Sequence, residues 1–241
     1  MIIWNELVRF FFNILIFLYN NLGQSMGLAI IALTVLVRLI LWPSQGKALR
    51  AQKELNALQP ELKQLQEKHK GDQAKQAKAM MDFYKERKVS PFSSCLPLLI
   101  QFPLIIALYQ VFRVGMNQES LTMLYPFIHR PDSINTIFLG YFNLAQPEKY
   151  VLPILTGASQ FIQSRMAMPK SLGQADNAQM AISKQMIYFL PIMTVVIAMS
   201  LPSALPLYWF VTTLLAILQQ YLINKSPMPK KKVRVTTRKA R

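Results

Sequence analysis

The stretch GLAIIALTVLVRLILW, which runs from Gly27 to Trp42, is the most informative part of this sequence for the fold class. It is apolar apart from Thr34 and Arg38, and Trp42 is followed at once by Pro43. A tryptophan at the end of an apolar stretch is typical of the membrane interface, and a proline is typical of a helix end. The stretch therefore predicts a membrane-spanning helix that stops at Pro43.

Four further apolar stretches follow, and together they predict an all-α, polytopic membrane protein with five transmembrane helices. The expected spans are 23–43, 93–114, 150–167, 186–204 and 205–224. The other segments are an interfacial amphipathic helix at 1–22, a cytoplasmic antiparallel coiled-coil hairpin at 44–92, an extracytoplasmic loop at 115–149, a cytoplasmic loop at 168–185 and a basic cytoplasmic tail at 225–241.

Composition supports a membrane protein and excludes other classes. The chain has 241 residues, of which 52% are hydrophobic and 16% charged, and its formal net charge is +16. This apolar content excludes disorder, and soluble enzymes rarely combine it with so few charged residues. No glycine-rich nucleotide-binding motif is present, and the single cysteine cannot form an internal disulfide.

The segment 1–22 is as apolar as a span, but its polar residues recur with helical spacing. Asn5, Arg9 and Asn13 are four residues apart and form one stripe, beside Glu6. This pattern favours an amphipathic helix in the membrane interface over a genuine span. A cleavable signal peptide is disfavoured, because no basic region precedes the segment and no small-residue cleavage site follows it.

Residues 44–92 are polar and predict two antiparallel helices joined by a turn at 69–72. Pro60 is expected to kink the first of them. A narrow apolar seam with spacings of three and four residues is expected to hold the two helices together. The seam residues are Leu55, Leu58, Leu62 and Leu65 in the first helix, and Ala74, Ala77, Met81 and Tyr84 in the second.

The distribution of basic residues predicts the orientation of the chain. The hairpin, the segment from Arg165 to Lys184 and the tail hold 22 of the 27 Lys and Arg residues, and all three fall on one side of a five-span protein. Basic residues in short loops are retained in the cytoplasm. We therefore expect the N-terminus outside and the C-terminus in the cytoplasm.

Arg38 is the most informative residue, because an arginine at the centre of a spanning helix costs about 2.5–3.5 kcal/mol on insertion scales. Either it snorkels to the headgroups beyond Pro43, or it serves a polar site inside the membrane together with Thr34, which lies one turn away. Polar side chains in the other spans would either form interhelical hydrogen bonds or line a wet cavity; they are Gln101, Gln110, Gln160, Gln163, Thr194, Thr212, Thr213, Gln219 and Gln220.

Neither catalysis nor metal binding is indicated. His69 and His129 are isolated, so we expect no enzyme, no metal and no cofactor. No Asp or Glu lies in a span, which disfavours an ion-coupled transporter, although a small transporter or channel with a polar interior is the alternative function. The tail suits anionic lipid headgroups, the phosphates of an RNA surface, or a simple topology anchor. Its cations are Lys230, Lys231, Lys232, Arg234, Arg238, Lys239 and Arg241.

Four strings together resemble the YidC-type membrane protein insertase family in its compact five-span bacterial form, from about Gly23 to Lys225. They are TVLVRLILWP (34–43), LQPELKQLQEKHK (58–70), SPFSSCLPLLIQFPLIIALYQVF (90–112) and LPLYWFVTTLLAILQQYLI (205–223).

The resemblance implies a multi-pass protein of the bacterial cytoplasmic (inner) membrane, which takes hydrophobic segments of newly made proteins through a hydrophilic groove and releases them into the bilayer. It implies nascent membrane proteins as substrates rather than a small molecule, and a ribosome bound by the tail. It also makes the Sec translocon, the signal recognition particle pathway and anionic lipids expected partners. The groove residues would be Arg38 as its positive charge, Thr34, Gln160 and Trp209 near the entering chain, and Gln101 and Thr212.

Overall fold

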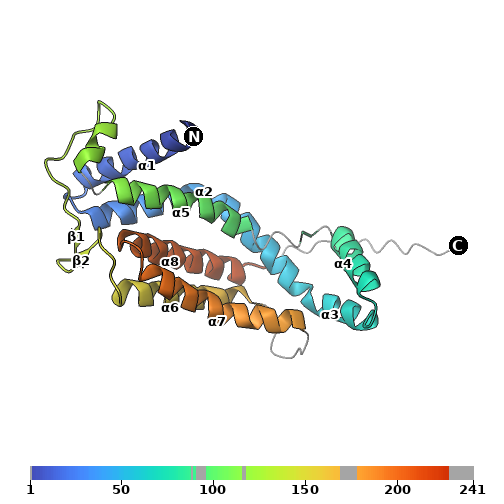
Figure 1. The fold of residues 1–241 in the computed structure, drawn as a ribbon. Helices are drawn as coiled ribbons and strands as arrows, with labels where there is room; N and C mark the ends of the chain where they lie inside the picture. The colour runs from blue at the N-terminus through green and yellow to red at the C-terminus, as the bar shows by residue number, and fades with distance from the viewer. Residues whose placement is uncertain (1, 88, 91–95, 116–117, 169–177, 228–241) are drawn as a thin grey trace.

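The computed structural model describes residues 2–87, 89–90, 96–115, 118–168 and 178–227, and these residues are mostly helical (Figure 1). The helices are α1 (Ile2–Asn21), α2 (Met26–Ala57), α3 (Gln59–Lys68), α4 (Gln73–Arg87), α5 (Leu96–Gly115), α6 (Val151–Ala167), α7 (Ala178–Ala198) and α8 (Ala204–Lys225). A 3-10 helix, η2 (Gln118–Met123), and an antiparallel pair of short strands, β1 (Ile137–Phe138) and β2 (Phe142–Asn143), lie between α5 and α6.

The long helices form an elongated bundle, with η2, β1 and β2 at one end and α3 and α4 at the other (Figure 1). α2 packs against α8, α8 against α6, and α6 against α7, while α1 packs against both α2 and α5. By length and composition α2 and α8 are able to cross a membrane, and the apolar parts of α5 and α7, Pro103–Arg113 and Ile187–Ala198, are shorter. The protein is therefore an all-α protein with membrane-spanning character.

The outer faces of the bundle are apolar, as expected of helices that meet lipid. Ile40 of α2 is 68% exposed and Ile192 of α7 is 63% exposed. The buried core lies where α1, α2 and α5 meet, and it includes Phe12, Ile30 and Leu108. Exposed apolar side chains spread over several helices are unfavourable in water and favourable in hydrocarbon.

The polar stripe of α1 contacts protein. Asn13 is buried, and its amide donates to the Met123 carbonyl at 3.1 Å and accepts from the Tyr125 backbone N–H at 2.7 Å. The Arg9 Nε donates to the same Met123 carbonyl at 3.1 Å. The stripe thus fixes α1 against η2 and the loop that follows it, and the apolar side chain of Phe10 is exposed instead.

The prediction that the first helix stops at Pro43 is wrong, because α2 continues without a break to Ala57. An internal proline costs a helix about 3 kcal/mol or more, since it removes one backbone donor and crowds the preceding turn. Here the turns beyond Pro43 are held by tertiary packing, with Gln45 and Ala48 buried. The chain bends instead at Leu58, where Pro60 occupies the first turn of α3 and its missing N–H is not needed.

α3 and α4 pack against each other, but through a different face of α4 from the predicted one. Ala74, Ala77 and Met81 are exposed. The facing residues follow the same three-and-four spacing from a start two residues later, and they place larger side chains against α3. Gln76 Nε2 donates to the Gln66 carbonyl at 3.1 Å, Gln66 Nε2 contacts the Met80 sulfur at 3.5 Å, and Arg87, which lies over the Phe83 ring, forms an ion pair with Glu61.

α6 begins at a carboxylate cap that sets its position at one end of the bundle. Glu148 accepts the backbone N–H groups of Tyr150, Val151 and Leu152 at 2.8, 3.0 and 2.8 Å. Partial burial alone would raise the pKa of Glu148, but the three donors outweigh it and lower this pKa below its ordinary value. A negative charge at this end also opposes the positive end of the helix dipole.

Gly157 sets how closely α6 approaches α7. A Cβ added there would lie 2.2 Å from Val195 Cγ2 and 3.2 Å from the Pro191 carbonyl oxygen. We expect Gly157→Ala to destabilise the protein by about 1–3 kcal/mol through overpacking, measured as a lower melting temperature in detergent. Val195→Ala in the same chain should restore part of the loss, and Ala158→Leu on the exposed face of α6 should cost nothing. A wild-type melting temperature for Gly157→Ala would contradict this close approach.

Candidate functional site

A cavity of about 340 Å³ lies inside the bundle, between α2, α5, α6 and α8. We call it the polar cavity. It is lined by Arg38, Gln45, Leu49, Gln52, Gln101, Ile105, Gln160, Gln163, Ser164, Ala167, Trp209, Thr212, Thr213, Ala216 and Gln220. Six of these residues are glutamines and three carry hydroxyl groups, and Arg38 is the only charged residue among them.

Arg38 has no neutralising partner in the part of the chain that the structure describes. Its side chain is only 7% exposed, and its Nε is buried without a hydrogen-bond partner there. None of the ion pairs among these residues includes it. Burying a cation without a counter-ion costs desolvation free energy, so the position of Arg38 favours the binding of a polar or anionic segment in the cavity.

Most of the side-chain amides that line the polar cavity are also available for hydrogen bonds to a bound polar segment. Within the described residues, the side chains of Gln45, Gln52, Gln160 and Gln163 make no hydrogen bond to protein. Gln101 Nε2 donates to the Tyr208 hydroxyl at 2.8 Å, and Gln220 Nε2 reaches the Met166 carbonyl at 3.3 Å. A surface of this kind favours water or a polar chain over lipid tails.

Helical periodicity brings the lining residues together. On α2, Arg38, Gln45 and Gln52 are seven residues apart, which places them on one face at every second turn. This stripe exists only because α2 continues past Pro43. α6 and α8 add residues at spacings of three and four, so each helix turns one polar face toward the cavity while its other faces stay apolar.

One side of the polar cavity is not sealed by helix packing. α5 and α6 both contribute lining residues, yet α5 packs mainly on α1 and less extensively on α2 and α8. The described residues of α5 and α6 form no comparable contact with each other. Close packing between α5 and α6 therefore does not close this side of the polar cavity.

The structure brings five of the predicted groove residues together. Arg38, Gln101, Gln160, Trp209 and Thr212 all line the polar cavity. Thr34 does not, because its buried hydroxyl donates to the Ile30 carbonyl of its own helix at 2.6 Å. The predicted cationic residues of the tail, from 230 onward, lie outside the described residues.

Sequence reasoning missed Gln45, Gln52 and Ser164, and it left Gln163, Thr213 and Gln220 among the polar span residues without placing them in the groove. The missed signal was the seven-residue repeat that starts at Arg38. Among the described residues there is no group of three or more His, Cys, Asp or Glu that could hold a metal ion.

Comparisons with known proteins agree on one family. The family described as 60Kd inner membrane protein matches residues 17–231. The membrane protein insertase YidC of Fusobacterium nucleatum subsp. nucleatum is 36% identical over 226 residues, which are 92% of this chain and 97% of the relative. The membrane protein insertase YidC 2 of Bacillus anthracis is 36% identical over 92% of this chain and 81% of the relative. The membrane protein insertase YidC of Oceanobacillus iheyensis is 33% identical over 95% of this chain and 86% of the relative.

Proposed function

The chain belongs to the YidC membrane protein insertase family, described as 60Kd inner membrane protein, and we propose that its polar cavity is the groove through which substrates enter the bilayer. Membrane protein insertion is the function that this membership assigns to the chain, and its substrates are membrane proteins. The family is not one of classical enzymes. The observation that supports the groove is Arg38, a buried cation without a counter-ion among the described residues, in a wall of free amides.

The polar cavity lowers the free energy that a hydrophilic segment needs to enter the membrane. A short polar terminus exchanges water for amides and hydroxyls instead of for hydrocarbon. Arg38 attracts acidic residues in that terminus, and the low local dielectric strengthens the attraction.

Release into lipid requires an exit, and we propose an opening between α5 and α6, the two lining helices whose described residues form little contact with each other. A Leu or Ile at the centre of a substrate span gains about 0.3–0.6 kcal/mol on entering the bilayer, which is substantial when summed over a span. We place the exit at this opening and infer that Trp209, together with the apolar faces of α6 and α8, guides the departing span. Crosslinks from a nascent span confined to α1 or α7 would contradict this route.

The orientation proposed is five spans, α2, α5, α6, α7 and α8, with α1 in the outer interface of the bacterial inner membrane. The support is the distribution of basic residues. In a five-span arrangement the basic residues of α3, α4 and the tail fall on one side of the membrane, and basic residues in such segments are retained in the cytoplasm. α2 then leaves the membrane near Pro43 and carries α3 and α4 into the cytoplasm, where they are placed to recruit or regulate the substrate.

Insertion into liposomes that contain only the purified full chain tests the function. A one-span or two-span substrate should become protease-protected above the level of empty liposomes, without the Sec translocon. Protection only when the translocon or the signal recognition particle pathway is added would make the chain a partner-dependent chaperone. Solute or ion flux without insertion would replace the insertase by the transporter alternative.

The basic tail is proposed to bind the ribosome. Truncation after Pro227 should reduce co-sedimentation with ribosomes, and binding by the full chain should weaken steeply with added salt, because cations that neutralise phosphates release counterions. Vesicles rich in anionic lipid serve as the second arm. If truncation abolishes vesicle binding and leaves ribosome binding intact, the tail is a lipid anchor and the ribosome proposal fails.

A further inference from the structure

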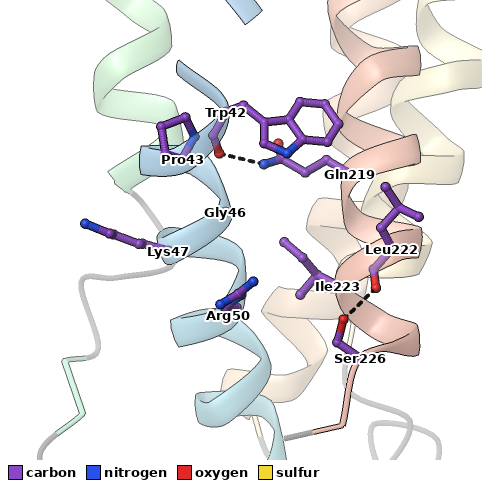
Figure 2. A pocket seen from close by; sticks show the side chains of 9 residues that line it. All are labelled: Trp42, Pro43, Gly46, Lys47, Arg50, Gln219, Leu222, Ile223 and Ser226. Atoms are coloured by element: carbon purple, nitrogen blue, oxygen red, sulfur yellow. Dashed lines mark hydrogen bonds between the residues drawn. The ribbon is translucent and has the colours of Figure 1, made fainter. Parts of the chain in front are cut away.

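A second cavity, of about 370 Å³, lies between α2 and the C-terminal half of α8 (Figure 2). We call it the α2–α8 pocket. It lies on the other side of the contact between the two helices from the polar cavity, because Gly46 and Gln219 line it whereas their neighbours Gln45 and Gln220 line the polar cavity. Gln219 Nε2 donates to the Trp42 carbonyl at 2.8 Å and so joins the two helices at the top of the pocket (Figure 2).

Two cationic side chains, those of Lys47 and Arg50, line the α2–α8 pocket. Both are exposed, and neither takes part in an ion pair within the described residues. In Figure 2, Lys47 extends away from α8 at the rim, whereas Arg50 lies at the level of Ile223. The nearby Lys53 is already engaged, since its Nζ donates to the carbonyls of Ile223, Asn224 and Ser226 at 2.9, 2.9 and 2.7 Å.

Apart from Gln219 and Ser226, the rest of the pocket is apolar and continues into the outer surface of the bundle. Leu222 lines it and is 49% exposed, and Leu218, one turn earlier on α8, is 49% exposed. On α2, the exposed Ile40 precedes the pocket residue Pro43 by one turn. Apolar side chains on two helices thus adjoin a pocket whose lining includes two cations and Trp42, an aromatic residue suited to the membrane interface.

We propose that the α2–α8 pocket binds an anionic phospholipid, with its phosphate held by Arg50, with Lys47 at the rim adding positive charge, and with its acyl chains along Ile40, Leu218 and Leu222. A free phosphate would leave the apolar stripes uncovered, whereas a lipid satisfies both halves of the site. The proposal rests on the membrane orientation given above, in which Pro43 lies near the cytoplasmic surface, but not on the use of the polar cavity as a groove. A lipid bound here bridges α2 and α8, the helices that carry Arg38 and Trp209, and so steadies the wall between pocket and groove.

Native mass spectrometry of the full chain in detergent tests the site, with phosphatidylglycerol and phosphatidylcholine as probes. The wild-type chain should retain one tightly held phosphatidylglycerol in preference to phosphatidylcholine. A cation near an anionic lipid surface contributes enough for each of Lys47→Gln and Arg50→Gln to weaken this binding about fivefold, and the pair about 25-fold. The matched control is Lys78→Gln with Lys85→Gln, which removes the same charge from α4 and should change nothing.

Three results would overturn the lipid site: equal retention of the two lipids, equal binding by the pocket variant and its α4 control, or displacement of phosphatidylglycerol by millimolar inorganic phosphate. The last would make the pocket a free-phosphate site. Arg38→Ala should retain the lipid fully while inserting substrates with acidic termini about tenfold less well, so a failure of the groove and a failure of the pocket give different results.

Discussion

Replacing Arg38 with alanine is expected to lower the insertion of substrates with acidic translocated termini by about tenfold, the factor that corresponds to about 1.4 kcal/mol of lost attraction. Arg38 is the one charged residue lining the polar cavity, and its Nε lacks a protein partner among the described residues. The measurement is protease protection in proteoliposomes. Each acidic substrate is paired with a version whose Asp and Glu are replaced by Asn and Gln, and the paired neutral substrate should lose much less.

Two further variants separate charge from polarity. Arg38→Lys should restore part of the insertion if positive charge is what matters, although it lacks the planar guanidinium group. Arg38→Gln keeps a polar side chain without charge and should resemble alanine with acidic substrates. The melting temperature should not fall in the alanine and glutamine variants, because removing an unpaired buried cation relieves a desolvation penalty. Equal loss for acidic and neutral substrates would show that Arg38 acts through the shape of the groove instead.

The residues at the centre of the candidate site could be predicted from sequence, because charged and strongly polar residues are rare inside membrane-spanning helices. An arginine within an apolar stretch and glutamines in the other predicted spans are expensive in hydrocarbon, and the structure places Arg38, Gln101 and Gln160 around one cavity. Thr34 shows the limit of the same reasoning. Spacing put it on the face of Arg38, but a threonine in a helix readily bonds the carbonyl four residues earlier, and the Ile30 carbonyl takes its hydroxyl.

What sequence reasoning missed depended on tertiary contacts. Pro43 was expected to end a helix by a local rule, but packing of the following turns against α8 overrides that rule and extends the stripe to Gln45 and Gln52. In α4, a spacing of three and four residues fits two faces, and contacts with Gln66 and Glu61 of α3 select the face that holds Met80 and Arg87. The polar stripe of α1 was predictable, but its partner, the Met123 carbonyl, lies 110 residues away from Asn13.

Replacing Gln160 and Gln163 together with leucine is expected to reduce insertion of acidic and neutral polar termini alike, by tenfold or more. Each polar group of an entering chain that loses its hydrogen-bond partner incurs about 1–3 kcal/mol, and these two amides form part of the α6 wall. The loss should exceed that of Arg38→Ala for neutral substrates, since hydration of the groove rather than its charge is removed. The readout is the same protease-protection assay.

The stability of this double variant should stay at the wild-type level, because neither amide bonds protein within the described residues. Gln110→Leu is the matched control. Gln110 lies in α5 but outside the polar cavity, and its Oε1 accepts from Trp4 Nε1 at 2.8 Å. Losing that bond should lower stability by about 0.5–1.5 kcal/mol while insertion per folded molecule is kept. If instead Gln160 and Gln163 behave like Gln110, their amides stabilise the bundle, and the cavity wall serves folding rather than the passage of a polar chain.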